Sequence, residues 1–71
     1  MRAYRRQAID TAIRRERLLA LMADGRWIHT VDLARKTPWA VLTVRHNLTR
    51  LKAAGMVESK RIGGASLWRL A

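Results

Sequence analysis

Residues 38–57 decide the fold, and they read PWAVLTVRHNLTRLKAAGMV. Their apolar residues recur every three or four positions, which is the period of one side of an α-helix. At about 100° per residue, three of them form a stripe about 60° wide, namely Val44, Leu48 and Leu51. The stripe predicts the side of a helix that packs on a hydrophobic core, with Val41 beside it.

The other side of this helix is polar and basic. We expect the helix to begin between Pro38 and Ala40, with Thr37 as one candidate cap, and to run to about Ala54 before Gly55 ends it. Opposite the apolar stripe lie Leu42, His46 and Thr49, flanked by Thr43, Arg45 and Arg50.

A helical pattern also occupies the first part of the chain. It runs from Thr11 to about Ala23, and Asp24-Gly25 ends it because glycine tolerates the left-handed conformation that follows many helices. Asp10 and Thr11 are acceptable N-caps, so residues 1–10 are either a basic arm or an extension of the helix.

Two short elements follow. Residues 26–29 place an aromatic side chain beside a β-branched one, which favours a brief strand. Thr30 is a suitable cap for a second helix. That helix should end near Lys36, because Pro38 disfavours helical geometry at the residue before it.

The end of the chain changes to the period of a β-hairpin. Residues 56–61 and 66–70 read as strands, and Gly63-Gly64 between them can both adopt the positive φ of a tight hairpin turn. Trp27 and Trp68 are expected in opposing strands, where they would close the core. Trp39 is either a lid over the core or a contact for a partner.

Charge gives the strongest indication of a partner. The 71 residues hold 15 Lys and Arg against 5 Asp and Glu, for a net charge of +10. Such a balance favours a polyanionic partner, with nucleic acid as the first candidate. Hydrophobic residues make up 49% of the chain, which is enough for one small folded domain, predicted over residues 11–71.

Several function classes are disfavoured. The chain has no cysteine, and His29 and His46 are isolated from each other and from any carboxylate cluster, so we expect no metal and no other cofactor. The sequence has no glycine-rich phosphate loop, no pattern that indicates a ligand pocket and no apolar run that could span a bilayer. We therefore expect neither an enzyme nor a membrane protein, but a cytoplasmic one, associated with the nucleoid if the source is bacterial.

The order helix, short strand, helix, helix, hairpin resembles the winged helix-turn-helix family. The matching stretches are Leu33-Ala34, the stripe of residues 44–51, Ala54-Gly55-Met56-Val57 and Leu67-Trp68-Arg69-Leu70. The chain is similar to the DNA-binding cores of small bacterial and phage regulators of the MarR and ArsR type. It departs from the family at the turn between helices, where Pro38-Trp39-Ala40 replaces the usual Gly and Ser.

The resemblance implies a mainly α fold of three helices with a β-hairpin wing, whose third helix enters the major groove of double-stranded DNA. Arg45, His46 and Asn47 would then be candidates to read base edges, with Asn47 ranked below Arg45 because it lies at the edge of the stripe. Leu42 and Thr43 would meet thymine methyl groups, while Thr49 and Arg50 would contact phosphate.

The wing and the arm provide further candidates. Lys60 and Arg61 lie beside Gly63 and Gly64, so a basic hairpin tip could follow the DNA backbone or enter the minor groove. Weaker candidates are the arm residues Arg2, Arg5 and Arg6.

These features predict a sequence-specific transcriptional regulator that acts as a homodimer or within a larger protein complex, since a domain of this size covers one half-site. Alternatives are a non-specific or architectural DNA binder, a DNA-recognition subunit of a packaging or recombination complex, and a winged-helix module that binds proteins.

Overall fold

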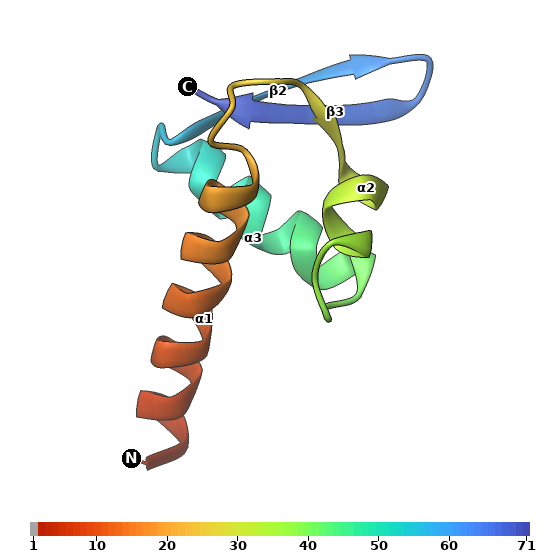
Figure 1. The fold of residues 1–71 in the computed structure, drawn as a ribbon. Helices are drawn as coiled ribbons and strands as arrows, with labels where there is room; N and C mark the ends of the chain where they lie inside the picture. The colour runs from red at the N-terminus through yellow and green to blue at the C-terminus, as the bar shows by residue number, and fades with distance from the viewer. Residues whose placement is uncertain (1) are drawn as a thin grey trace.

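Within residues 2–71, three helices and a three-stranded antiparallel sheet form a winged helix-turn-helix fold, as predicted (Figure 1). This computed structural model describes the backbone of residues 2–71 and the side chains of residues 9–71. The elements in chain order are α1 (Arg2–Leu21), β1 (Ile28–His29), α2 (Thr30–Arg35), α3 (Val41–Ala53), β2 (Val57–Ile62) and β3 (Ala65–Leu70). None of the described helices is long and apolar enough to cross a membrane.

The first helix begins earlier than the predicted start at Thr11. It begins at Arg2, so residues 2–10 extend the helix, and Asp10 and Thr11 lie inside it instead of capping it. The reason is that Arg2–Leu21 holds no glycine or proline and is rich in Arg, Ala and Leu, which all favour helix. Figure 1 shows the N-terminal half of α1 projecting away from the other elements.

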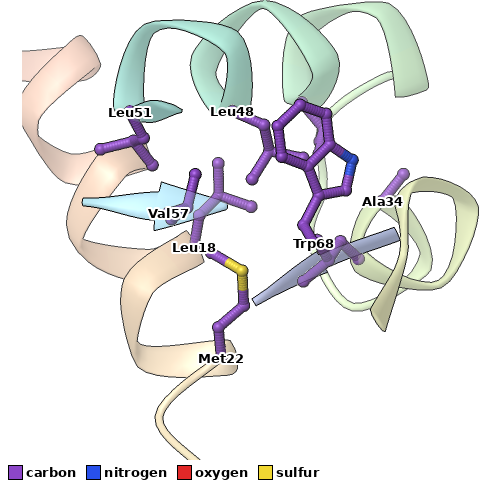
Figure 2. Close-up of a cluster of buried hydrophobic side chains, with 9 residues drawn as sticks. Leu18, Met22, Ala34, Leu48, Leu51, Val57 and Trp68 are labelled. Carbon is purple, nitrogen blue, oxygen red and sulfur yellow. The ribbon is translucent and has the colours of Figure 1, made fainter. Parts of the chain in front are cut away.

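The core lies between the three helices and the inner face of the sheet (Figure 2). The predicted stripe of α3 is confirmed, because the exposed fractions of Val44, Leu48 and Leu51 are 0%, 0% and 1%. The other buried hydrophobic residues come from α1, α2 and the hairpin, and they are Leu18, Met22, Leu33, Ala34, Val57 and Trp68. Every element except β1 thus contributes a buried side chain to one hydrophobic cluster.

The hairpin forms as the glycine pair predicts, although β2 is shifted by one residue and β3 begins one residue earlier than predicted. Gly63 and Gly64 have φ angles of 54° and 83°, and the pair Ile62 and Ala65 closes the two-residue turn. Positive φ at both turn positions matches the right-handed twist of a hairpin. The sheet order is β1-β3-β2, so the hairpin joins the body of the molecule through β3 and the very short β1.

Two predictions around β1 were wrong. The strand covers only Ile28–His29, because the backbone N–H of Arg26 donates to the Asp24 carboxylate (3.2 Å) instead of joining the sheet. The cap of α2 is not Thr30 but His29, whose Nδ1 accepts the backbone N–H of Val31 at 3.0 Å.

The limits of α3 agree with prediction at one end only. The helix begins at Val41, later than expected, and its cap Ala40 makes no side-chain hydrogen bond. Thr37 does not cap α3, because the helix begins four residues later; its hydroxyl donates to the Ala34 carbonyl at 3.0 Å and accepts the backbone N–H of Trp39 at 3.3 Å. At the other end Gly55 takes a φ of 77° and its N–H donates to the Lys52 carbonyl, which ends the helix as predicted.

Candidate nucleic-acid interface

The outer side of α3 presents the predicted contact residues to solvent. Leu42 is 61% exposed, and Arg45, His46, Thr49 and Arg50 are also exposed. Thr43 is half-buried. The core stripe fixes this orientation, because a helix that buries Val44, Leu48 and Leu51 must turn the opposite side outward.

Asn47 lies at the boundary of the core. Its residue is 7% exposed, and its side-chain Nδ2 donates to the Thr43 carbonyl at 2.8 Å. A buried amide that already donates within its own helix has less reach toward a partner than Arg45. Asn47 is thus buried at the edge of the outer side, where it lines a hollow together with exposed His46 and Arg50.

A basic groove separates α3 from the hairpin. It holds about 450 Å³ and is lined by Arg45, Thr49, Lys52, Ser59, Lys60, Arg61, Ser66 and Trp68. Lys52 is a member that the sequence reasoning missed. The signal was available, because Lys52 follows Arg45 by seven residues, which places both on the same side of a helix.

The two faces of the hairpin carry different chemistry, because successive side chains of a strand point to opposite faces. Val57 of β2 is buried against the core, so Arg61 lies on the same inner face, four residues further along. Lys60 lies on the outer face, where its Nζ is 4.3 Å from the ring centroid of Trp27. The two neighbouring cations of the wing therefore have different surroundings.

Trp27 does not close the core as predicted. It is half-buried outside the hydrophobic cluster, and besides Lys60 it also contacts Arg69, whose guanidinium carbon is 4.4 Å from the ring centroid. Arg69 in turn forms an ion pair with Glu58 on the neighbouring strand. Sequence reasoning missed this outer cluster, since its members meet only through the register of the sheet.

A buried hydrogen-bonded chain holds the hairpin to α2. The indole N–H of Trp68 donates to the Thr30 hydroxyl at 2.9 Å, and that hydroxyl donates to the Ser66 carbonyl at 3.2 Å. Trp68 and Thr30 are 6% and 2% exposed. Because buried donors are costly to leave unpaired, this chain fixes the angle between the wing and the helices.

No acidic residue lies on α3 or lines the hollows on its two flanks. All five carboxylates lie in residues 10–32 or at Glu58, and three of them pair with arginines, as Asp24–Arg26, Asp32–Arg35 and Glu58–Arg69. Arg45, Arg50 and Arg61 form no ion pair among the residues that the structure describes. Part of the uncompensated positive charge thus lies on the outer side of α3 and the inner face of the wing.

The remaining predicted residues are those of the hairpin tip, the N-terminal arginines and Trp39. Gly63 and Gly64 are exposed at the hairpin tip, next to exposed Arg61. The side chains of Arg2, Arg5 and Arg6 lie outside the described residues. Trp39 is half-buried and packs on the core, and no group of three metal-ligating side chains occurs in the described part of the chain.

Solved structures of the same architecture come from Mycobacterium bovis. One is a crystal structure of a possible transcriptional regulatory protein (fragment 1–100), 33% identical to this chain, with a TM-score of 0.76, covering 82% of this chain and 61% of that one. The other is a solution structure of a homodimeric winged helix-turn-helix DNA-binding domain (fragment 1–100) of a possible ArsR-family transcriptional regulator. It is 28% identical, with a TM-score of 0.74, and the match covers 94% of this chain and 69% of that one.

The chain spans 61% of the length of the crystallised fragment. No protein-family model and no curated protein sequence matches it. The architecture, the basic outer side of α3 and the two solved structures lead to the same conclusion. The chain has the winged helix-turn-helix fold, and it is similar to the DNA-binding domain of a possible ArsR-family transcriptional regulator.

Proposed function

We propose that this domain is a sequence-specific transcriptional regulator that binds double-stranded DNA, with α3 in the major groove. The observation that carries the proposal is the exposed, carboxylate-free outer side of α3 beside the basic groove of the wing. A helix with its side chains is about 10–12 Å across, and the major groove is about 12 Å wide. The outer side of α3 therefore fits the groove with its polar side chains toward base edges.

Within α3, Arg45 is the proposed base reader. Its exposed guanidinium has the forked geometry that recognises the O6 and N7 atoms of guanine. His46 is the second polar candidate, and exposed Leu42 suits a thymine methyl group. Asn47 ranks below both because it is buried. Thr43, like Leu42, would meet a thymine methyl group, and Thr49 and Arg50 would fix the helix on the sugar-phosphate backbone.

The wing would hold the DNA backbone or enter the minor groove next to α3. Arg61 is best placed for phosphate, since it lies on the face turned toward α3 and has no acidic partner among the described residues. Lys60 also lines the groove, but its ammonium already lies over Trp27. The Gly63-Gly64 tip and the N-terminal arginines Arg2, Arg5 and Arg6 would add backbone contacts.

We further propose that two copies associate on DNA. The similar domain from Mycobacterium bovis is homodimeric, and a domain of this size covers one half-site. On α1, Ile9 and Ile13 are 59% and 54% exposed and lie one turn apart, on the side away from buried Leu18. Such an apolar stripe on a projecting helix is suited to pack against the same stripe of a second copy.

Arg45→Ala tests the proposal. We expect it to cost about 1–3 kcal/mol on duplexes that carry the cognate base pair and little on others, because one bidentate base contact is lost. Fluorescence anisotropy of labelled duplexes at near-physiological salt measures the change. Arg35→Ala, on α2 and already paired with Asp32, is the matched control and should leave affinity nearly unchanged. Equal losses in both variants would contradict a role of α3 in reading bases.

A further inference from the structure

A second basic hollow lies on the other flank of α3, between this helix and α1. Its volume is about 180 Å³, and it is lined by Thr11, Arg14, Thr43, His46, Asn47 and Arg50. The first two residues belong to α1 and the last four to α3. We name it the α1–α3 recess. Two helices about thirty residues apart in sequence thus bring two guanidinium groups and an imidazole around one open hollow.

The recess gathers positive charge without compensation. No carboxylate lines it, and neither Arg14 nor Arg50 forms an ion pair among the residues that the structure describes. Like charges held together cost free energy, which a bound anion would offset. Guanidinium, imidazole and hydroxyl groups are also the donors with which proteins hold phosphate oxygens.

The recess and the basic groove between α3 and the hairpin, which we call the wing-side groove, lie on opposite flanks of α3. Around the axis of α3, Arg45 and Lys52 lie on the flank toward the wing, and Thr43 and Arg50 lie on the flank toward α1. The exposed ridge of Leu42 and His46 separates the two flanks. A helix that fills the major groove has one phosphate backbone along each side, because the groove is hardly wider than the helix.

We propose that the α1–α3 recess binds a phosphodiester of the DNA strand opposite to the one held by the wing, with Arg14 and Arg50 as its main contacts. This inference rests on the proposed function and extends the DNA interface to α1. The occupant is a polyanion backbone and not a sequestered small anion, because the recess is open on one side and Arg14 keeps part of its surface in solvent.

The test compares Arg14→Gln with Arg17→Gln. Both remove one charge from α1, but Arg17 does not line the recess and is exposed. We expect Arg14→Gln to weaken binding several-fold at near-physiological salt and to reduce the slope of log K against log salt by about 0.9, the value for one phosphate contact. Arg17→Gln should change the slope much less, and Arg14→Lys should restore part of the affinity. Circular dichroism and thermal melting establish that each variant is folded.

Phosphate ethylation interference locates the contact. With the wild-type domain we expect interference on both backbones that border the α3 site, and with Arg14→Gln a loss of interference on one strand only. If wild-type protein binds the duplex and Arg45→Ala weakens it, but Arg14→Gln and Arg17→Gln behave alike, this inference is wrong while the proposed function stands. If the wild-type protein binds no duplex at this salt concentration, the proposed function itself fails.

A titration with inorganic phosphate distinguishes a recess that binds the phosphodiester of a DNA strand from one that binds free phosphate. We expect the NMR signals of His46 and Arg14 to respond only at millimolar phosphate, since a single free anion lacks the neighbouring contacts of a DNA strand. Saturation at micromolar phosphate, with unchanged DNA affinity of Arg14→Gln, would overturn the inference in favour of a small-anion site.

Discussion

One tryptophan packs on each face of the sheet, and the two have different roles. On the inner face Trp68 is 6% exposed, packs in the core and donates its indole N–H to Thr30. On the outer side Trp27 is half-buried and lies under the cations of Lys60 and Arg69. The inner tryptophan links the wing to the helices through its hydrogen bond to Thr30. The outer one makes cation–π contacts with two side chains that could otherwise contact DNA.

The same division separates two neighbouring cations. Lys60 and Arg61 are adjacent in sequence, yet one lies over an aromatic ring and the other faces α3 without a partner. A count of basic residues near a hairpin tip therefore overstates the number available to DNA. What matters is the face of the strand on which each cation lies, and that face is set by the burial of Val57.

Removing the inner tryptophan should have the largest effect. We expect Trp68→Ala to lower the free energy of unfolding by about 3–5 kcal/mol, as for other buried aromatic side chains. This is comparable with the whole stability of a domain of this size, roughly 3–5 kcal/mol, so the variant should be largely unfolded at room temperature. Urea denaturation followed by circular dichroism measures it. A cooperative melt close to wild type would show that Trp68 does not support the core.

A smaller effect should follow from breaking only the buried hydrogen-bonded chain. Thr30→Val keeps the shape of the side chain but leaves the Trp68 indole N–H and the Ser66 carbonyl without their partner. We expect a loss of about 1–3 kcal/mol in unfolding free energy. Thr49→Val is the control, because that hydroxyl is exposed and donates to the nearby Arg45 carbonyl. Similar losses of unfolding free energy in both variants would show that the buried hydrogen bonds of Thr30 stabilise the fold no more than an exposed one does.

The two wing cations should differ in their contribution to DNA affinity. We expect Arg61→Gln to weaken binding to all sequences alike and to reduce the salt slope by about one unit, because one phosphate contact is lost. Lys60→Gln should reduce the slope by less, since its ammonium lies over Trp27. Anisotropy titrations at several salt concentrations compare them. A larger slope change for Lys60→Gln would reverse the assignment of the two faces.

The smallest effect should come from the outer tryptophan. Exposed cation–π contacts contribute about 0.5–1 kcal/mol each, so we expect Trp27→Ala, which removes two of them, to lower the unfolding free energy by about 1–2 kcal/mol. Because Lys60 is then released, DNA affinity should stay the same or rise slightly. A loss of stability as large as that of Trp68→Ala would place Trp27 in the core after all.

The sequence was sufficient to predict features that depend on local pattern. The stripe of α3 and the turn at Gly63-Gly64 follow from helical periodicity and from backbone geometry, and both were confirmed. Two of the wrong predictions, those for Thr30 and Trp27, concern side chains whose partners are far away in sequence. The local sequence predicts Thr30 as a helix cap, but its hydroxyl instead accepts a hydrogen bond from Trp68, 38 residues later. The local sequence also predicts Trp27 as a core residue, but the register of the sheet places Lys60 over its ring.

The candidate site shows the same limit. The outward side of α3 could be predicted, because it lies opposite the stripe that is buried. The contributions of Lys52 to the wing-side groove and of Arg14 to the α1–α3 recess depend on how helices and hairpin pack together. Tertiary packing decides whether a given cation lies beside a carboxylate, over an aromatic ring or in open solvent. Charge composition alone does not predict these surroundings.

Selection from a random duplex library at near-physiological salt, followed by sequencing, tests the central claim most directly. Salt must be controlled, because a chain with a net charge of +10 binds any DNA in dilute buffer. We predict enrichment of a short motif, present as an inverted repeat if two copies bind together, and loss of one motif position with Arg45→Ala. Retained binding without any enriched motif would contradict sequence-specific recognition by α3 and would indicate an architectural DNA binder instead.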